Sequence, residues 1–142
     1  RVGNYSVEDL DRLLNRQSGL AGLTGLSDMR AVCEAAAAGD EDARLAREIY
    51  AYRIRKYIAA YLGVVESLDA VVFTAGVGEN DAELRDMIIS PLGHLGFDID
   101  AGANIAKGNR TISSATSRFS VMVIATNEEA EIARQAIAAI AG

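Results

Sequence analysis

Apolar residues at helical spacing predict helices over residues 6–16, 40–62 and 127–141, and residues 31–39 and 80–89 also predict helices from their helix-forming residues and caps. Ser6, followed by Asp9, approximates a capping box and predicts where the first helix begins. Gly39 is a suitable C-cap for the second helix, and Asn80 is a suitable N-cap for the fourth. We therefore expect helices in both halves of the chain.

Between the first two predicted helices, "QSGLAGLTGLSDMR" carries Gly19, Gly22 and Gly25 with leucines beside them. Each of these glycines would cost a helix about 1 kcal/mol relative to alanine. We therefore predict a loop with apolar anchors over residues 17–30.

The longest predicted helix covers residues 40–62. Charged residues separate its apolar positions, which are Ala46, Ile49, Ala51, Ile54, Tyr57, Ile58, Tyr61 and Leu62. The tyrosines lie on the apolar side of this periodicity. We therefore interpret them as packing residues rather than as a platform for stacking on bases.

Three β-rich runs, "DAVVFTA", "RTISS" and "FSVMVIAT", predict strands over residues 69–75, 110–114 and 119–126. A glycine-broken turn in residues 92–100 leads to a short edge strand. The resulting order is strand, helix, strand, strand, helix. This order predicts an α/β fold in which helices cover a mixed or parallel sheet.

Composition narrows the class of protein. Half of the 142 residues are hydrophobic, enough for one domain to bury a core. The net charge of -6, without a block of lysine or arginine, argues against a nucleic-acid partner. The single Cys33 cannot form an internal disulfide, and no apolar stretch is long enough to cross a bilayer. We expect a cytoplasmic protein with no membrane partner.

The chain opens on "RVGNYSVEDL", which has neither the apolar core of a signal peptide nor an initiator methionine. We expect it to be part of a longer protein.

The segment "VVFTAGVGEN" at residues 71–80 passes from a predicted strand into a predicted helix through Gly76 and Gly78. Such a turn brings backbone N–H groups and the positive end of a helix dipole to one place, which attracts phosphate. However, the third glycine of a dinucleotide fingerprint and the Gly-Lys-Ser/Thr of a P-loop are both missing. The residues alone leave a structural turn and a ligand loop as alternatives.

A second predicted strand ends in "TNEE", residues 126–129. Acidic residues in a first helical turn ordinarily stabilise the helix through its dipole. The alternative is that one carboxylate holds Mg²⁺, which accompanies nucleotide phosphates and prefers oxygen ligands. Open α/β sheets collect ligands at the carboxyl ends of their strands, which favours this alternative.

Asp28 and Arg30 in "GLSDMR" form the third candidate pair. An aspartate can accept from a ribose hydroxyl or an adenine amino group, and a guanidinium can stack on a base or bind a phosphate. Alone, they also fit the start of a surface helix capped by Ser27 or Asp28. We assign no catalytic or metal role to the lone His94, and we interpret Cys33 as a small buried hydrophobe.

Together, four segments of the sequence resemble the acetate and propionate kinase family, the acetokinases. In chain order they are "SGLAGLTGLSDMR", "FTAGVGENDAELR", "LGHLGFDID" and "VIATNEEAEIAR". The resemblance implies the ribonuclease-H-like fold of the actin, hexokinase and sugar-kinase superfold, with helices packed on a mixed sheet. It also implies transfer of phosphate between ATP and a short carboxylate with Mg²⁺, and a homodimer formed through this region.

The same resemblance implies roles for individual residues. The residues implied to bind the nucleotide are Asp28, Met29, Arg30, Gly76, Val77, Gly78, Glu79 and Asn80. Glu128 is implied to take part in magnesium binding, with Glu129 the less favoured of the pair. Arg85 matches an arginine position of the family, and we interpret it as structural support for the nucleotide loop.

The sequence departs from the family pattern in two small ways. "GLSDMR" is one residue shorter than the usual spacing, and Ala125 stands where a proline is common. Neither change removes a proposed ligand.

The family's catalytic aspartate, substrate-gripping arginines, active-site histidines and phosphate loop have no counterpart in these residues. We therefore expect residues 1–142 to be the C-terminal part of the nucleotide-binding domain, without the N-terminal domain. We assign no catalytic residue and predict no kinase activity for this chain alone.

Three alternatives remain at this point. The resemblance does not distinguish acetate from propionate or butyrate, because the acyl pocket lies outside it. A non-catalytic, self-associating module is the alternative of a different class, since residues 43–62 offer an apolar face. An ordinary dinucleotide-binding domain is disfavoured by the missing third glycine.

Overall fold

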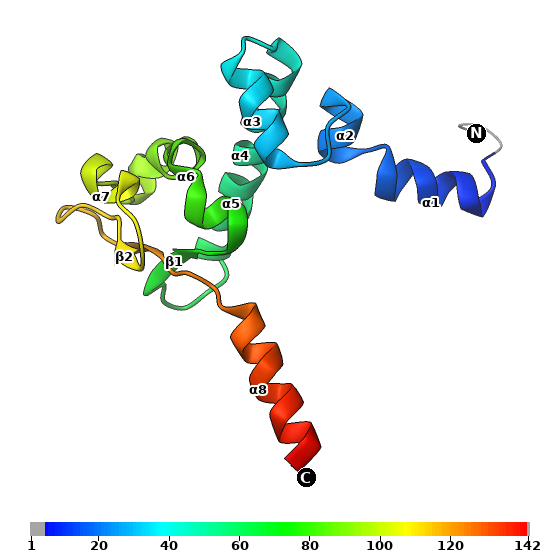
Figure 1. Ribbon diagram of the computed structural model, residues 1–142. Coiled ribbons are helices and arrows are strands. Elements are labelled where there is room, and N and C mark those ends of the chain that lie inside the picture. Colours follow the sequence, from blue (N-terminus) through cyan, green and yellow to red (C-terminus); the bar gives the residue numbers. More distant parts are fainter. Residues whose placement is uncertain (1–4, 142) are drawn as a thin grey trace. The chain divides into compact units, whose positions relative to one another are not determined.

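The computed structural model describes residues 5–141. The chain divides into two compact units, residues 1–57 and residues 58–142, and each is described by itself (Figure 1).

The helices of the described residues are α1 (Val7–Arg16), α2 (Gly19–Thr24), α3 (Met29–Ala37), α4 (Glu41–Leu62), α5 (Ala75–Asn80), α6 (Ala82–Ile89), the 3₁₀ helix η1 (Ser90–Leu95), α7 (Ala101–Ile105) and α8 (Glu128–Ala141). The strands are β1 (Ala70–Phe73), β2 (Arg110–Thr111) and β3 (Ser120–Val123).

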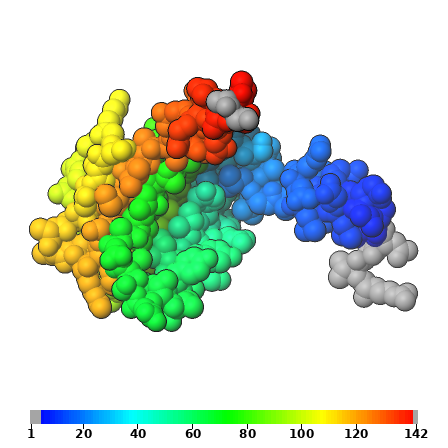
Figure 2. Space-filling model, turned by 90° about the horizontal axis from the view of Figure 1, so that it is seen from below, coloured from blue at the N-terminus to red at the C-terminus, as the bar shows by residue number. Residues whose placement is uncertain are grey.

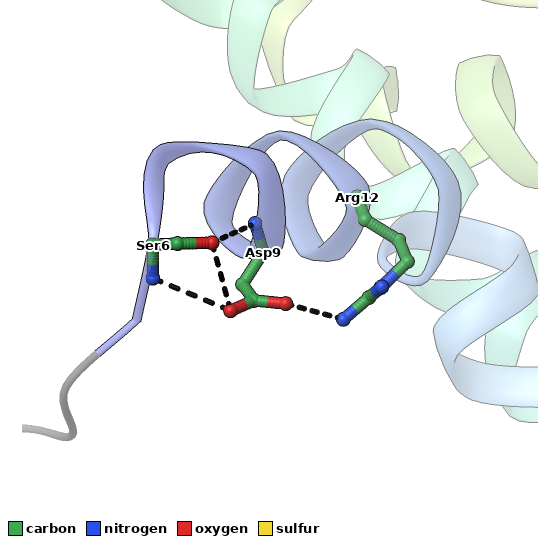
Figure 3. A network of polar contacts seen from close by, with 3 residues as sticks. All are labelled: Ser6, Asp9 and Arg12. Atoms are coloured by element: carbon green, nitrogen blue, oxygen red, sulfur yellow. Dashed lines mark hydrogen bonds and ion pairs between the residues drawn. The ribbon is translucent and has the colours of Figure 1, made fainter.

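Helix α1 begins with the predicted capping box. Ser6 Oγ accepts from the backbone N–H of Asp9 at 3.1 Å, and the Ser6 N–H donates to Asp9 Oδ2 at 3.3 Å (Figure 3). Arg12 adds an ion pair with Asp9 across one turn, 2.5 Å between Nη2 and Oδ1 (Figure 3). These contacts satisfy donors that the first helical turn leaves without backbone partners.

The predicted loop over residues 17–30 is partly wrong, because α2 occupies its centre. Gly25 has φ +73° and ends the helix in the left-handed region, where its N–H donates to Ala21 O at 2.9 Å. Two leucines and an alanine share this six-residue helix with two glycines, so the cost of the glycines does not prevent a short helix.

Helix α3 ends at the predicted glycine. Gly39 has φ +99°, and its N–H donates to Ala36 O at 3.1 Å. The Asp40 N–H donates to Ala35 O at 3.0 Å, which completes a Schellman motif. The prediction of a helix end at Gly39 is confirmed.

Helix α4 is the predicted long helix, with 22 residues. Its buried positions are Ala43, Ala46, Arg47 and Ala51. The prediction that its tyrosines pack inside is wrong for Tyr52, Tyr57 and Tyr61, which are 55%, 57% and 61% exposed. Small alanine side chains allow close packing, so this part of the first unit's core forms on the alanine side of the helix.

The second unit contains a three-stranded mixed sheet in the order β1-β3-β2. Strand β1 pairs with β3 in parallel, with Phe73 opposite Val123. Strand β2 pairs with β3 in the antiparallel direction. This confirms the α/β prediction, although the predicted edge strand is reduced to one bridge between Ile99 and Ser113.

The buried side chains of the second unit come from the sheet, from α6 and from the segment after it. They include Phe73, Leu84, Ile88, Ile89, Leu92, Phe97, Ile112, Val121 and Val123. Helix α6 is capped by Asp81, whose Oδ1 accepts from Leu84 N at 2.8 Å. The prediction of Asn80 as this cap is wrong by one residue, because Asn80 is the last residue of α5.

Helix α8 forms where the closing helix was predicted, but it does not cover the sheet. Figure 1 shows it extending away from the strands. Three of its isoleucines, Ile132, Ile137 and Ile140, are 66%, 68% and 86% exposed. The amphipathic pattern therefore predicted the helix correctly but not its packing within this unit.

Candidate functional site

A pocket of about 350 Å³ lies where β1 and β3 end. Its lining residues are Ala75, Gly76, Thr126, Asn127, Glu128 and Glu129. The two strands are parallel neighbours, so their carboxyl ends meet at one edge of the sheet. The space-filling view shows the orange segment around β3 beside the green segment around β1 and α5 (Figure 2).

Residues 74–80, the first wall of the pocket, follow β1 directly and consist of Thr74 and helix α5. The structure corrects the predicted loop, since Ala75–Asn80 is a six-residue helix. Ala75 has φ +60°, a left-handed conformation that costs a residue with a Cβ atom about 1–2 kcal/mol. The strained residue lies in the pocket lining.

The two glycines of the first wall have different surroundings. A Cβ atom on Gly78 would lie 3.3 Å from the backbone carbon of Phe73. A Cβ atom on Gly76 would meet nothing within 4 Å, and Gly76 lines the pocket. Gly78 therefore permits close packing of α5 on the end of β1, whereas the open side of Gly76 is available to a ligand.

The remaining predicted residues of this wall are Val77, Glu79 and Asn80. Val77 and Glu79 are half-buried, and Asn80 is exposed. The Asn80 side-chain amide donates to Gly76 O at 2.8 Å, so it closes the turn of its own helix. None of these three residues is among the pocket-lining residues.

Arg85 of α6 supports the first wall from inside the protein. Its side chain is 2% exposed, and Nη1 donates to the carbonyls of Gly78 and Glu79 at 2.8 and 3.0 Å. Nε and Nη2 donate to the side chain and carbonyl of Asn104 at 2.8 and 2.6 Å. Burial lowers the pKa of Arg85, and the nearby Arg110 lowers it further. These bonds agree with the support role expected for Arg85.

Asn104 is a buried polar residue that the sequence reasoning missed. It is 5% exposed, and its Nδ2 donates to Ala82 O at 2.8 Å. Arg110 Nη2 also donates to the Asn104 carbonyl at 3.0 Å. Asn104 lies 19 residues after Arg85, and no local pattern links the two positions.

Residues 124–129, the second wall of the pocket, begin without regular structure and enter α8 at Glu128. The backbone N–H of Thr126 donates to Glu79 Oε1 at 2.9 Å, and the Ala125 N–H donates to Asn109 Oδ1 at 2.8 Å. Asn127 Oδ1 accepts from Ala130 N at 3.0 Å and caps the helix. Side chains from distant parts of the sequence therefore hold this wall.

The donor set of the pocket fits a hydrated Mg²⁺. Glu128 and Glu129 supply carboxylates, and Thr126 and Asn127 supply neutral oxygen atoms. Within residues 5–141, no group of three histidine, cysteine, aspartate or glutamate side chains is suited to a metal. Mg²⁺ usually binds one or two carboxylates and completes its shell with water and phosphate oxygens. Two carboxylates are therefore sufficient for this type of site.

Asp28, Met29 and Arg30 belong to the first unit. Asp28 caps α3, since its Oδ1 accepts from Arg30 N at 2.8 Å, and its Oδ2 pairs with Arg30 Nη2 at 2.8 Å. These hydrogen bonds lower the pKa of the Asp28 carboxyl. The Arg30 side chain is 88% exposed, whereas Met29 is 7% exposed and lies in the core. The expected helix start with Asp28 as its cap is confirmed.

The structure thus brings Gly76 and Glu128 to one pocket in the second unit. Among the described residues, none of the helices is both long enough and apolar enough to cross a membrane.

Comparisons with known proteins cover almost the whole chain. The profile of the acetokinase family matches residues 1–134. An acetate kinase from Leifsonia xyli is 49% identical over 99% of this chain and 36% of its own length. An acetate kinase from Streptomyces coelicolor is 46% identical over 99% of this chain and 35% of its own length. The chain therefore spans about a third of the length of these relatives.

Solved structures show the same fold. A propionate kinase from Francisella tularensis is 48% identical over 88% of this chain and 32% of its own, with a TM-score of 0.81. An acetate kinase from Porphyromonas gingivalis is 34% identical over 94% of this chain and 34% of its own, with a TM-score of 0.84. The expected ribonuclease-H-like α/β class is confirmed by these neighbours. The chain belongs to the acetokinase family.

Proposed function

We propose that this chain is the nucleotide-binding part of a kinase that transfers phosphate between ATP and a short-chain carboxylate. The observation that carries the proposal is the shared pocket of Gly76 and Glu128. Two strand ends with ligand-suited residues meet there, as expected for a site in an open α/β sheet. Residues 1–142 would form the C-terminal part of the nucleotide-binding domain.

In this proposal, the nucleotide comes close to the backbone of the first wall. Gly76 has no neighbour where a Cβ atom would lie, so backbone and ligand can come together there. The segment Gly76–Asn80 forms the nucleoside side of the site, and Val77 and Gly78 shape it from behind. Asp28, Met29 and Arg30 also belong to the proposed nucleotide-binding residues, and the exposed Arg30 guanidinium is suited to a base or a phosphate.

Glu128 would hold the magnesium ion, with Glu129 beside it in the pocket lining. When bound, Mg²⁺ would supply positive charge that offsets the negative charge of the ATP phosphate oxygens while the phosphoryl group passes to the carboxylate oxygen. The protein must also keep donor and acceptor in line, because most catalysis of phosphoryl transfer is positioning.

The acceptor is proposed to be acetate, with propionate as the alternative. Relatives of this chain include both acetate kinases and a propionate kinase. We propose that the chain alone does not form acyl phosphate, because the expected carboxylate-binding and phosphate-cradling residues are not among its motifs. A homodimer and a cytoplasmic location also belong to the proposal.

A calorimetric titration of the 142-residue chain with ADP, with and without Mg²⁺, tests the nucleotide site. We expect weak binding that Mg²⁺ strengthens. Glu128→Gln should remove most of the strengthening by Mg²⁺, and it should not weaken the binding of metal-free ADP. Glu66→Gln is the matched control, since Glu66 is an exposed carboxylate of the same unit. Equal Mg²⁺ dependence in wild type and Glu128→Gln would contradict the metal assignment.

Catalysis and self-association need separate measurements. Incubation of the chain with ATP, Mg²⁺ and acetate or propionate should yield no acyl phosphate, and robust formation would overturn the predicted inactivity. Sedimentation of the chain with and without ADP separates dimerisation from a response to the ligand. Dimers with no ADP binding at any concentration would favour the non-catalytic, self-associating alternative.

A further inference from the structure

Glu79 makes contacts that the nucleotide proposal alone does not explain. Its Oε1 accepts from the backbone N–H of Thr126 at 2.9 Å and from Thr126 Oγ1 at 3.2 Å. The two residues are 47 positions apart in the sequence. One carboxylate oxygen therefore ties α5 to the residue two places before Glu128.

The anchor of this contact is buried. Arg85 Nη1 donates to the carbonyl of Glu79 at 3.0 Å and to that of Gly78 at 2.8 Å. The Arg85 side chain is 2% exposed. The backbone of Glu79 is thus fixed by the interior of the second unit, and its carboxylate extends from a rigid element.

The other end of the contact lies in a segment with little support of its own. Residues 124–127 have no regular secondary structure, and Thr126 is exposed. Thr126 lines the pocket, whereas Glu79 is not among the lining residues. A carboxylate directed at nucleotide phosphates would also repel them. Glu79 is therefore placed to act through Thr126 rather than by touching the ligand.

We propose that Glu79 is a positioning residue, which holds Thr126 so that Glu128 stays in place opposite Gly76. This inference rests on the proposed function of the pocket and deepens it. It moves Glu79 from the set of nucleotide contacts to the framework that orients the metal-binding wall.

Two substitutions separate positioning from direct contact. Glu79→Gln keeps a side-chain oxygen that can accept from Thr126 but loses the charge, and Glu79→Ala loses the acceptor. We expect Glu79→Ala to weaken binding of Mg²⁺-ADP about tenfold and Glu79→Gln to retain most of the affinity. Glu66→Gln and Glu66→Ala are the matched controls and should bind like wild type. Equal losses in Glu79→Gln and Glu79→Ala, or none in either, would overturn the proposal.

Hydrogen exchange of the Thr126 amide provides a readout without nucleotide. In the 142-residue chain, Glu79→Ala should speed exchange of this amide about tenfold or more, while the buried amides of β3 keep their wild-type protection. Unchanged protection of the Thr126 amide in Glu79→Ala would contradict the inference about Glu79. If wild type does not bind Mg²⁺-ADP but the Thr126 amide exchanges faster in Glu79→Ala, the result would count against the proposed function and would support the contact between Glu79 and Thr126.

Discussion

The two strand-to-helix turns that face each other across the pocket are built in different ways. The turn after β1 enters α5 within two residues, packs Gly78 on Phe73 and has its carbonyls held by buried Arg85. The turn after β3 crosses residues 124–127 without regular structure and enters a helix whose isoleucines are exposed.

This comparison shows that two neighbouring strand-to-helix turns can follow the same order of elements and still be held by contacts of different strength. The first wall is stabilised by close packing and by bonds to a buried cation, which water cannot easily replace. The second wall is stabilised by single hydrogen bonds at exposed positions, which water can partly replace. The second wall, which carries the proposed metal ligand Glu128, is therefore the less strongly held of the two walls.

The largest effect is expected from Arg85→Ala, which would break the first wall. The change removes the guanidinium donor from the carbonyls of Gly78 and Glu79 and from the side-chain oxygen of the buried Asn104. We expect the free energy of unfolding to fall by about 3 kcal/mol, since buried acceptors lose charged donors. Urea denaturation measures this loss. Lys107→Ala, an exposed change in the same unit, should stay within about 0.5 kcal/mol of wild type, and equal midpoints for the two variants would contradict the assignment.

Two glycine substitutions test whether Gly78 serves packing of the first wall and Gly76 serves ligand binding. Gly78→Ala places a Cβ atom 3.3 Å from the Phe73 backbone, so we expect a loss of about 1–2 kcal/mol from overpacking. Gly76→Ala places a Cβ atom in open space and should preserve stability while weakening Mg²⁺-ADP binding. Urea denaturation and calorimetry of both variants test this reversal. The assignment fails if Gly76→Ala is the more destabilised of the two.

On the second wall, Asn127→Ala should cost about 1 kcal/mol of local helix stability, because it removes the cap of α8. The loss should appear as lower helix content by circular dichroism and faster exchange of the Ala130 amide. The global urea midpoint should move little, since the apolar side chains of α8 are exposed. Asn127→Asp is the control that keeps an N-cap acceptor. A fall in the global midpoint as large as that of Gly78→Ala would show α8 to be part of the core.

The smallest effect is expected for Asn109→Ala. Its side chain accepts from the Ala125 N–H at 2.8 Å, and Ala125 is exposed. Water can replace the lost acceptor, so stability should fall by about 0.5 kcal/mol or less. Exchange of the Ala125 amide should nevertheless become faster than in wild type. Wild-type exchange at this amide would show that another group supports the start of the second wall.

Sequence patterns predicted several local features correctly. The predicted helix caps are present at three places: the Ser6–Asp9 pair starts α1, Asp28 starts α3, and Gly39 ends α3. The side chains suit the helix starts, and the backbone freedom of glycine suits the helix end. The helical periodicity of residues 40–62 predicted α4 almost to the residue. These features depend on neighbours within a few positions, so the local sequence contains the necessary information.

Other predictions of local structure were wrong. The apolar periodicity of α4 did not reveal that alanines, rather than Tyr52 and Tyr57, face the core. The cost of glycine in helices did not exclude α2, and Asp81 rather than Asn80 caps α6. Helix α7 lies in a segment with no predicted element. For α4, packing partners decide which face is buried, and they are not visible in a short window of sequence.

The sequence by itself determined the α/β class and, through its resemblance to the acetokinases, the family and the two motifs that line the candidate site. Short segments are sufficient for this, because the resemblance rests on motifs such as "FTAGVGEN" and "TNEE", and each of them is contiguous in the sequence. Only the tertiary structure decided that the two motifs line one pocket, that Gly76 is open and Gly78 packed, and that Glu79 bonds Thr126. The shared pocket and the bond of Glu79 to Thr126 join residues about fifty positions apart, and the parallel pairing of β1 with β3 is what brings them together.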